Sequence, residues 1–441
     1  MLDVQVFHSL PALAPWRSQL AKLHRSSPRQ SPFTTLEFYE AYLAHDEFLQ
    51  EGVDLQVWFL VAFEGGAPVG YLALRRTWER IGPLKAARLE FLATHDVVQP
   101  HVVSRPEDEA RCVEAFYREL LARKADWSML ELKQQAPGAA LFPPAGAGLQ
   151  AHYVRTFEAA TVSVIPNRFA TLDGYLAALD KKFRANLKRQ LRHLLAAGEV
   201  RFLYSADPDA TPAMLDLYLD VERRSWKVRV AGTIGRDERR VAFFRRLLDP
   251  RMPFRVGIGL VLLGGLPIAG CISNEQAGTL HVPQVVFDDR FSKLTPGYLI
   301  FPLLMREVIE ARGAGLNLMS GFASYKAKWG AQVTECRSVQ LFHRGSLLFY
   351  KAIAGELRRA LELRLRGPAA AVSGNVAKHA TEDDAEVQDE GAGEVGADRR
   401  FVDALVSNLA GKQVRVTSAT EIDTLFGLGI TTAKAVVTRA S

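Results

Sequence analysis

Cysteine is scarce in this sequence. Its 441 residues include only Cys112, Cys271 and Cys336, and no two of them lie close together. This spacing excludes a cysteine-rich zinc motif, and so low a count is typical of reducing compartments rather than of disulfide scaffolds. We therefore interpret each cysteine as a small apolar side chain, and we predict no metal site.

The sequence also lacks a long hydrophobic run. Its longest apolar stretch, around residues 256–263, is far shorter than the roughly 20 residues needed to cross a bilayer. Residues 1–30 do not place an apolar core after a charged start, which argues against a secretory signal. We therefore expect a cytoplasmic protein without a membrane span.

Charge of one sign is not in large excess. The formal net charge is +6, and 24% of the residues are charged, which is the composition of an ordinary globular protein. A net charge of this size can favour an anionic ligand, but it does not by itself predict a nucleic-acid-binding protein. The length is sufficient for two domains with complete cores and a tail.

Two distant segments carry the same pattern. Residues 57–63 and 256–263 are apolar and are typical of strands, and each is followed by a Gly-Gly turn and a second strand with a proline near its start. In both copies further strand, a helix and a short strand come next. We interpret this order as a tandem duplication of one α/β unit.

The repeat suggests a division of the chain. We assign residues 1–150 and 151–345 to the two units and residues 346–366 to a C-terminal helix. Residues 367–399 are rich in Ala, Gly, Glu and Asp, with almost no large apolar residue, and predict a disordered acidic linker. Residues 400–441 form a short segment of unknown role, with a possible helix at Phe401–Ala410 and a strand at Gln413–Thr417.

The most informative stretch is 279–330, where an apolar strand (Leu280–Phe287) leads into a helix that opens at Thr295-Pro296-Gly297. Pro283 cannot donate to a ladder, so it marks an edge, a bulge or a splay, whose exposed backbone can pair with an amide-bearing ligand such as pantetheine. We expect Thr295 to be the N-cap, Pro296 to occupy the first helical position, and Gly297 to let a ligand approach.

The start of this helix predicts an anion site. Its first turn carries no acidic side chain, so the free backbone N–H groups and the positive helix end are available to a pyrophosphate. The alternative is a buried strand and a core helix with an ordinary cap. The corresponding helix of the first unit opens with Pro106-Glu107-Asp108-Glu109, and three carboxylates would repel a pyrophosphate. If one unit binds an anionic cofactor, it is therefore the second.

Three side chains near this stretch are candidates for chemistry. Tyr325 and Lys326 follow a short strand that ends at Ser320, near the sheet edge where open α/β folds bind ligands. Tyr325 can act as a general acid to a leaving thiolate, and Lys326 can pair with a phosphate or an acceptor; an ordinary surface turn fits as well. Asp288 can be a general base or can anchor its loop.

One predicted helix is strongly basic. Apolar residues recur along one side of it at helical spacing. Its cations are Lys181, Lys182, Arg184, Lys188, Arg189 and Arg192. They can bind an anionic acceptor, tRNA, a polysaccharide or a lipid head group, or they can form an ordinary solvated face.

Taken together, these residues resemble the GNAT-type acetyltransferases of the CelD-like group, with the double-GNAT arrangement of FemAB-type transferases. The matching segments are residues 181–189, 222–226, 264–270, 287–288, 295–297, Gly321 and 325–329. The resemblance implies an α/β protein with two tandem GNAT-like folds, an acyl-CoA donor bound by the second, and direct transfer from thioester to amine. Thr295-Pro296-Gly297 stands where the usual pyrophosphate loop, Arg/Gln-x-x-Gly-x-Gly/Ala, would lie.

We therefore predict an N-acyltransferase, most simply an N-acetyltransferase, acting on an amine of a sugar, peptidoglycan or polysaccharide precursor. The predicted catalytic residues are Asp288 and Tyr325. The predicted acyl-CoA contacts are Val285, Phe287, Thr295, Gly297 and Tyr298. The predicted acceptor contacts are Arg184, Lys188, Trp226 and Lys326, in the cleft between the units.

Two alternatives remain open from the sequence. A FemAB-like transferase would use aminoacyl-tRNA, and its basic helix would contact RNA phosphates in a salt-dependent manner. A non-catalytic binding or scaffold protein of a polysaccharide biosynthesis complex would need no acyl donor.

Overall fold

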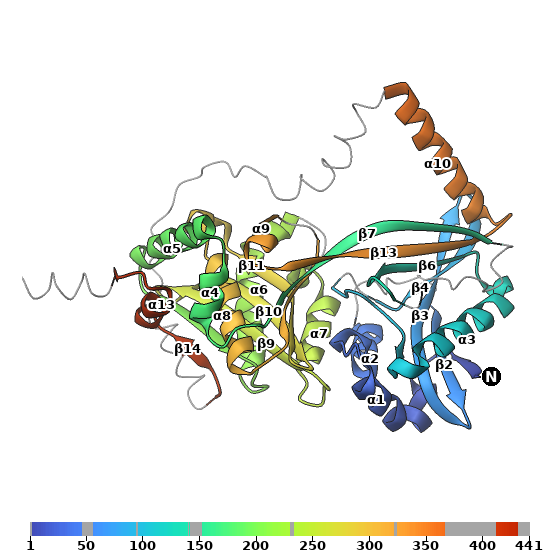
Figure 1. Ribbon diagram of the computed structural model, residues 1–441, viewed down its shortest axis with the longest axis horizontal. Helices are drawn as coiled ribbons and strands as arrows, with labels where there is room; N and C mark the ends of the chain where they lie inside the picture. Colours follow the sequence, from blue (N-terminus) through green and yellow to red (C-terminus); the bar gives the residue numbers. More distant parts are fainter. Residues whose placement is uncertain are drawn as a thin grey trace, which may run out of the picture.

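The computed structural model describes residues 2–45, 56–93, 96–139, 141, 152–229, 233–321, 324–366 and 412–430. Figure 1 shows strands running through both halves of the molecule, with helices on both faces. The predicted fold class, an α/β protein with mixed sheets and two tandem units, is confirmed by one sheet of 14 strands in which the same strand order occurs twice. No helix among the described residues is long and apolar enough to cross a bilayer.

The described residues of the first half form seven strands and three longer helices. They are β1 (Asp3–Phe7), α1 (Arg17–Ser26), α2 (Leu36–His45), β2 (Gln56–Glu64), β3 (Ala67–Ile81), β4 (Leu84–Phe91), β5 (Val103–Ser104), α3 (Glu109–Ala122), β6 (Met129–Gln135) and β7 (His152–Pro166). Short 3-10 helices are η1 (Pro11–Trp16), η2 (Pro32–Thr34), η3 (Pro106–Asp108) and η4 (Lys124–Asp126).

The second half repeats this alternation. Its elements are α4 (Leu172–Ala178), α5 (Lys181–Ala196), β8 (Val200–Ser205), α6 (Thr211–Arg223), η6 (Trp226–Arg229), η7 (Ile234–Arg236), α7 (Glu238–Leu247), β9 (Arg255–Leu263), β10 (Leu266–Gln276), β11 (Thr279–Phe287), η8 (Asp289–Leu294), α8 (Gly297–Glu310), β12 (Gly315–Ser320), α9 (Ser324–Lys328) and β13 (Gln332–His343). The C-terminal elements are α10 (Leu347–Arg366), β14 (Arg415–Thr417) and α13 (Ala419–Phe426).

Both predicted Gly-Gly hairpins are confirmed. Gly65 and Gly66 connect β2 to β3, and Gly264 and Gly265 connect β9 to β10, in antiparallel register. All four glycines have positive φ, which is the backbone that a two-residue hairpin turn requires and that glycine adopts without steric cost.

The strand order of the two halves is the same until the last strand. In each half four antiparallel strands end beside one parallel neighbour, β4 beside β6 and β11 beside β12. The following strands then cross over: β7, which follows β6 in sequence, pairs with β12, and β13, which follows β12, pairs with β6. Because β7 and β13 also pair with each other, the sheet is continuous through the predicted boundary near residue 150, and that boundary stays a prediction.

The two faces of the second half are covered differently. Helices α4, α5, α8 and α13 share one apolar core on one face of the sheet. Helices α6 and α7 pack on the other face together with α2 of the first half, and Phe38 of α2 meets Phe243 of α7 edge-on at a ring distance of 5.6 Å. The second face is therefore also the interface between the halves.

The C-terminal segment returns to the second half. The predicted strand near residues 413–417 is confirmed as β14, which pairs antiparallel with the edge strand β8. Helix α13 then adds Ile422 and Phe426 to the core of α4, α5 and α8. The predicted linker at 367–399 and the possible helix at 401–410 lie outside the described residues.

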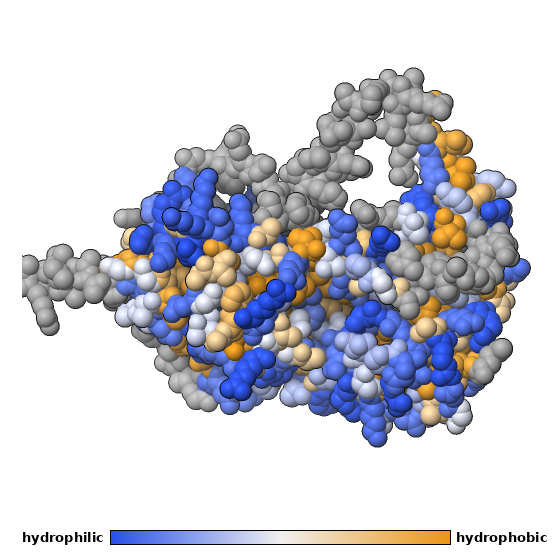
Figure 2. Space-filling view, viewed as in Figure 1, coloured by the Kyte–Doolittle hydropathy of each residue, from blue (hydrophilic) through white to orange (hydrophobic). Residues whose placement is uncertain are grey.

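The predicted helix after residue 346 is confirmed as α10, which projects from the first half (Figure 1). Leu348 packs beneath its first turn against Ala86 and Phe342. Tyr350, Leu357 and Leu361 are exposed, and apolar atoms are visible along this helix in Figure 2.

Candidate functional site

The sheet opens between β11 and β12. Their parallel register covers three pairs, from Thr279–Gly315 to His281–Asn317. Beyond His281, β11 continues to Phe287 on the side of β10, whereas β12 continues to Ser320 on the side of β7. The β10–β11 register also shifts around Pro283, so the bulge and splay that this proline predicted are confirmed.

Helix α8 begins close to the end of β11 and lacks an acidic residue in its first turn. A Cβ built on Gly297 would meet no heavy atom within 4 Å, so open space lies against the first turn. Backbone N–H groups at such a helix start attract anions. The corresponding helix of the first half, α3, differs in its first turn as expected, because Asp108 precedes this helix and Glu109 begins it.

The prediction that Thr295 caps α8 is wrong. The residue before the helix is Pro296, and no side chain caps the first turn. Thr295 instead has φ 47°, in the left-handed region, and ends the 3-10 helix η8. Its hydroxyl oxygen is buried without a hydrogen-bond partner. A left-handed residue cannot present its side chain to the next turn in the way an extended N-cap residue does.

An aromatic cluster lies behind the start of α8. Trp329 is buried, and its ring contacts Phe183 at 4.8 Å, Tyr298 at 5.8 Å and Phe301 at 5.8 Å between centroids. Tyr325 stacks on Phe301 at 6.2 Å and stays exposed. Of the predicted acyl-CoA contacts, Val285, Phe287 and Tyr298 are half-buried at the border of this same core.

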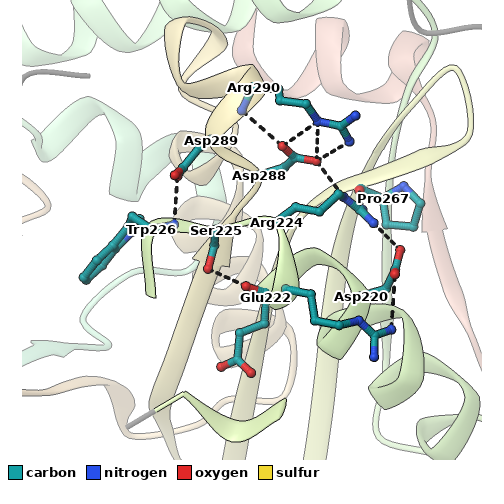
Figure 3. Close-up of polar contacts among 10 residues, drawn as sticks. Asp220, Glu222, Arg224, Ser225, Trp226, Pro267, Asp288, Asp289 and Arg290 are labelled. Atoms are coloured by element: carbon teal, nitrogen blue, oxygen red, sulfur yellow. Dashed lines mark hydrogen bonds and ion pairs between the residues drawn. The ribbon is translucent and has the colours of Figure 1, made fainter. Parts of the chain in front are cut away.

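Asp288 is held by two arginines (Figure 3). Its buried carboxylate accepts hydrogen bonds from Arg224 Nε at 2.7 Å and from Arg290 Nη2 at 2.7 Å, and it also accepts one from the Arg290 backbone N–H. Burial acts to raise the pKa of this carboxyl, but the hydrogen bonds from Arg290 and Arg224 outweigh it and keep the pKa below its ordinary value. Asp288 is thus a stable carboxylate at neutral pH.

Trp226 is held near Asp288 by contacts of the neighbouring residues. Arg224 also donates to the carbonyl of Pro267, and the backbone N–H of Trp226 donates to Asp289 Oδ1 at 2.9 Å. The indole of Trp226 is exposed and points away from Asp288 in Figure 3. The structure therefore joins Asp288 and Trp226 through neighbouring residues, whereas Tyr298 and Tyr325 belong to the aromatic cluster.

Several predicted cationic contacts have partners within the protein. Arg184 donates to the carbonyls at the end of α4, including that of Ala177 at 2.6 Å. Lys326 donates to the carbonyls of Ser320 at 2.7 Å and Gly321 at 3.1 Å. Arg192 donates to the carbonyl of Leu428, so the basic helix α5 also holds the C-terminal segment.

Lys188 lies on the same face of α5. Its Nζ is 3.5 Å from the position that a Cβ on Gly427 would take, and so it too lies beside the end of α13. The hydrophilic surface over α5 is visible in Figure 2.

A polar cluster at the interface between the halves was not predicted from the sequence. Lys227 Nζ donates to Gln284 Oε1 at 2.7 Å, and Gln284 Nε2 donates to Asp96 Oδ1 at 2.6 Å. The other oxygen of Asp96 accepts from Arg240 Nη2 at 2.7 Å. Because Asp96 comes from the first half and the other three from the second, the chain of contacts crosses the interface.

Two further members of this cluster have atoms without partners. Glu222 is fully buried; its Oε2 accepts from the backbone N–H of Gly235 at 2.8 Å, while its Oε1 has no hydrogen-bond partner. The hydroxyl of Tyr218, one turn earlier on α6, is also buried without a partner. Burial lowers the pKa of half-buried Lys227 to about 8, although Glu222 and Asp96 act in the opposite direction.

His281 lies where the pairing of β11 and β12 ends. Its ring is buried against Phe33 of the first half at 5.4 Å, and neither ring nitrogen has a hydrogen-bond partner. Burial lowers the pKa of the imidazole to about 4, so it is neutral at pH 7.

Residues 181–327 match a family model described as an acetyltransferase (GNAT) domain. This span begins with α5 and includes the splay, the start of α8 and the contacts of Asp288. The second half is thus similar to a GNAT acetyltransferase domain, and this similarity supports an acyltransferase. A comparison with curated proteins found no match.

Three solved structures are distantly similar in fold. The structure of FemX has a TM-score of 0.49 at 10% identity and covers 73% of this chain and 95% of its own. The C-terminal domain of a lysylphosphatidylglycerol synthetase from Agrobacterium fabrum has a TM-score of 0.47 at 15% identity, and the match covers 79% of this chain and 97% of that domain. A tandem GNAT protein from the clavulanic acid biosynthesis pathway has a TM-score of 0.42 at 16% identity, and the match covers 77% of this chain and 98% of that protein.

Proposed function

We propose that this protein is an N-acyltransferase that takes its acyl group from acyl-CoA. The observation that carries the proposal is the splay of β11 and β12 beside an acid-free helix start with open space at Gly297. The match of residues 181–327 to a GNAT acetyltransferase domain supports the same reaction class.

The proposed donor lies across this opening. Its pyrophosphate binds at the start of α8 beside the backbone N–H of Gly297, where the helix dipole favours negative charge. Its pantetheine amides pair with the part of β11 that lies beyond His281, because that stretch is not paired with β12. Val285 and Phe287, half-buried at this edge, contact the apolar part of the pantetheine arm.

In the reaction the acceptor nitrogen attacks the thioester carbonyl, the C–N bond forms, the C–S bond breaks, and the thiolate leaves. The nitrogen must lose a proton and the thiolate must gain one. We assign the donation to the hydroxyl of Tyr325, whose side chain is partly exposed. Asp288 is a poor choice of base because two arginines already stabilise its carboxylate, and we propose that it anchors the loop between β11 and α8.

The proposed acceptor is an amine of a cell-envelope or exopolysaccharide precursor, in keeping with the CelD-like resemblance. It enters between the halves, next to exposed Trp226. Lys188 is a further proposed contact for anionic groups of such a precursor. Arg184 and Lys326 support the site indirectly, since they hold the end of α4 and the end of β12.

Calorimetry with acetyl-CoA tests the donor site, using Gly297→Glu and Gly297→Ala as a matched pair. A glutamate in the first turn of a helix stabilises the helix, so the variant is expected to fold, yet it places a carboxylate where the pyrophosphate binds. We expect the alanine variant to bind like the parent and the glutamate variant to bind at least about tenfold more weakly, a loss of about 1.4 kcal/mol.

Two results would count against this proposal. If millimolar acetyl-CoA neither binds nor stabilises the parent protein, acyl transfer from CoA is excluded as its activity. If parent and Gly297→Glu bind acetyl-CoA equally, the donor lies elsewhere than at the start of α8.

A further inference from the structure

Glu222 has an unusual environment for a carboxylate. It is fully buried on α6, and one oxygen accepts a backbone N–H while Oε1 has no partner. In Figure 3 its side chain points away from the contacts of Asp288, so the arginines that stabilise Asp288 do not serve it. Buried carboxylates are normally paired or fully hydrogen-bonded. Oε1 thus has an unmet hydrogen bond inside the interface.

The surroundings of Glu222 are polar and come from both halves. Lys227 of η6 and Tyr218 of α6 lie within its electrostatic reach, as the pKa shifts of both groups show. Gln284 of β11 links Lys227 to Asp96 of the first half, and Arg240 of α7 closes the chain.

This cluster lies next to the proposed donor but on the opposite face of the sheet. Gln284 belongs to the part of β11 that β12 does not pair. Successive strand residues point to opposite faces, so Val285 borders the core of α5 and α8 while Gln284 faces the interface with the first half. Gln284 therefore connects the strand proposed to bind the donor with the cluster on the opposite face.

We propose that Glu222 accepts the proton of the acceptor amine, with Lys227, Gln284 and Asp96 as positioning residues that the two halves build together. The inference rests on the proposed acyl transfer. The amine donates an N–H hydrogen bond to Oε1, its nitrogen attacks the thioester carbon, and the proton passes to Oε1 as the C–N bond forms. The C–S bond breaks, and the thiolate is protonated by Tyr325 or by solvent.

The proposal gives the first half a role in the reaction. Asp96 fixes the amide of Gln284, which in turn directs its oxygen to Lys227. These contacts hold the ammonium of Lys227 within the electrostatic reach of Glu222.

The test compares Glu222→Gln with Asp216→Asn in the full chain. Asp216 is also on α6, but its exposed carboxylate pairs with Arg245 at the surface. Acetyl-CoA binding is measured by calorimetry, and thiol release from acetyl-CoA is followed with glucosamine, spermidine, a lysine-containing peptide and hydroxylamine. We expect Glu222→Gln to bind acetyl-CoA like the parent and to lose amine-dependent thiol release by about 100-fold or more, while Asp216→Asn retains both.

Positioning is tested with Lys227→Met and Asp96→Asn by measuring kcat and acetyl-CoA binding separately. Each variant breaks the hydrogen-bond chain that runs through Gln284, so we expect kcat to fall while acetyl-CoA binding stays like that of the parent. A residue with a merely structural role would lower the amount of folded protein and leave the kcat of the folded fraction unchanged.

The outcomes separate the inference from the function it rests on. A parent that does not bind acetyl-CoA overturns the proposed function and the inference with it. The inference alone is overturned if the parent binds acetyl-CoA and releases thiol with an amine, and the Glu222→Gln variant releases thiol at the same rate. Binding without amine-dependent thiol release for any of the four nucleophiles also overturns the role of Glu222.

Discussion

Arg224 donates from Nε to Oδ2 of Asp288 over 2.7 Å, and this contact ties the end of α6 to the end of β11. The carboxylate is fully buried, whereas the Arg224 side chain keeps 24% of its surface exposed. Asp288 also caps η8, the short helix that leads to Thr295 and α8. The relative position of the splay and the start of α8 thus depends on one carboxylate.

Asp288→Asn should destabilise the protein by about 3 kcal/mol at pH 7, because it removes one partner of a buried ion pair and leaves the other. The folded-state pKa of Asp288 lies below its ordinary value, so this contribution is present above about pH 4, the usual pKa of an unfolded Asp, and is lost as the pH falls through the folded-state pKa. Urea unfolding at pH 7 and at pH 3 measures both effects.

Arg290→Met is the matched control for this prediction. The Arg290 side chain is 54% exposed, so its pair with Asp288 should be worth about 1 kcal/mol or less. Two results would contradict the assignment of Asp288 as the anchor. One is an equal loss of unfolding free energy in the two variants at pH 7. The other is a difference in unfolding free energy between the parent and Asp288→Asn that does not shrink at low pH.

Lys227 should react with amine reagents at unusually low pH. Its pKa is lowered to about 8 by burial, whereas exposed lysines titrate near about 10.4. Because only the neutral amine reacts, labelling of Lys227 should rise with a midpoint near about pH 8, followed by peptide mass spectrometry against exposed lysines of the same chain. Asp96→Asn should lower the midpoint further, since the Asp96 carboxylate favours the charged ammonium. An unchanged midpoint in that variant would place Asp96 outside the electrostatic reach of Lys227.

The C-terminal segment should contribute to stability although a stretch of 45 residues separates its first described residue from α10. Phe426 of α13 is 2% exposed within the core of α4, α5 and α8, so Phe426→Ala should cost about 3–5 kcal/mol. Val416→Ala on β14 is the control, because this side chain is 44% exposed and its loss should change the free energy of unfolding by at most about 0.5 kcal/mol. Thermal and urea unfolding of the full chain measure both.

Truncation after residue 366 extends the same prediction. Removal of β14 leaves β8 as an open sheet edge, and open edges pair with other chains. We expect the truncated protein to associate in a concentration-dependent way in light scattering. A truncated protein that is monomeric and as stable as the parent would mean that the segment adds nothing to the fold.

The local features of this fold could be predicted from the sequence because neighbouring residues determine them. The Gly-Gly pairs produced both hairpins, and Pro283 marked the bulge where β11 leaves β12. The prediction for Thr295 failed because Pro296 and the preceding 3-10 helix place Thr295 in the left-handed region. Helix α13 was missed although its signal was present: Ser418 accepts from the N–H of Glu421, three residues on, as in a capping box.

The candidate site could be predicted only in part. Pattern and turn residues placed the splay and the start of α8, since both lie within one stretch of chain. The contact of Asp96 with Gln284 joins residues 188 positions apart, and no periodicity indicates which strands of two similar units will share an interface. Nor does an alternating pattern show that β13 will pair with β6 of the other half. These features depend on tertiary packing rather than on local sequence.

The crossing of β7 and β13 predicts that the first half does not fold alone. A fragment of residues 1–150 lacks β13, so β6 has an unpaired edge, and it lacks α7, so Phe38 and its neighbours on α2 lose the core that they share with Phe243. An open edge and an exposed apolar face both promote aggregation. We expect this fragment to be insoluble or to unfold without cooperativity when expressed alone, and to be recovered in soluble form when residues 151–441 are produced in the same cells.

The fragment of residues 151–441 keeps β7 and β13 paired with each other and β7 paired with β12, so it should retain more secondary structure by circular dichroism. A fragment 1–150 that is monomeric and unfolds cooperatively by itself would show that β13 and α7 are dispensable to the first half.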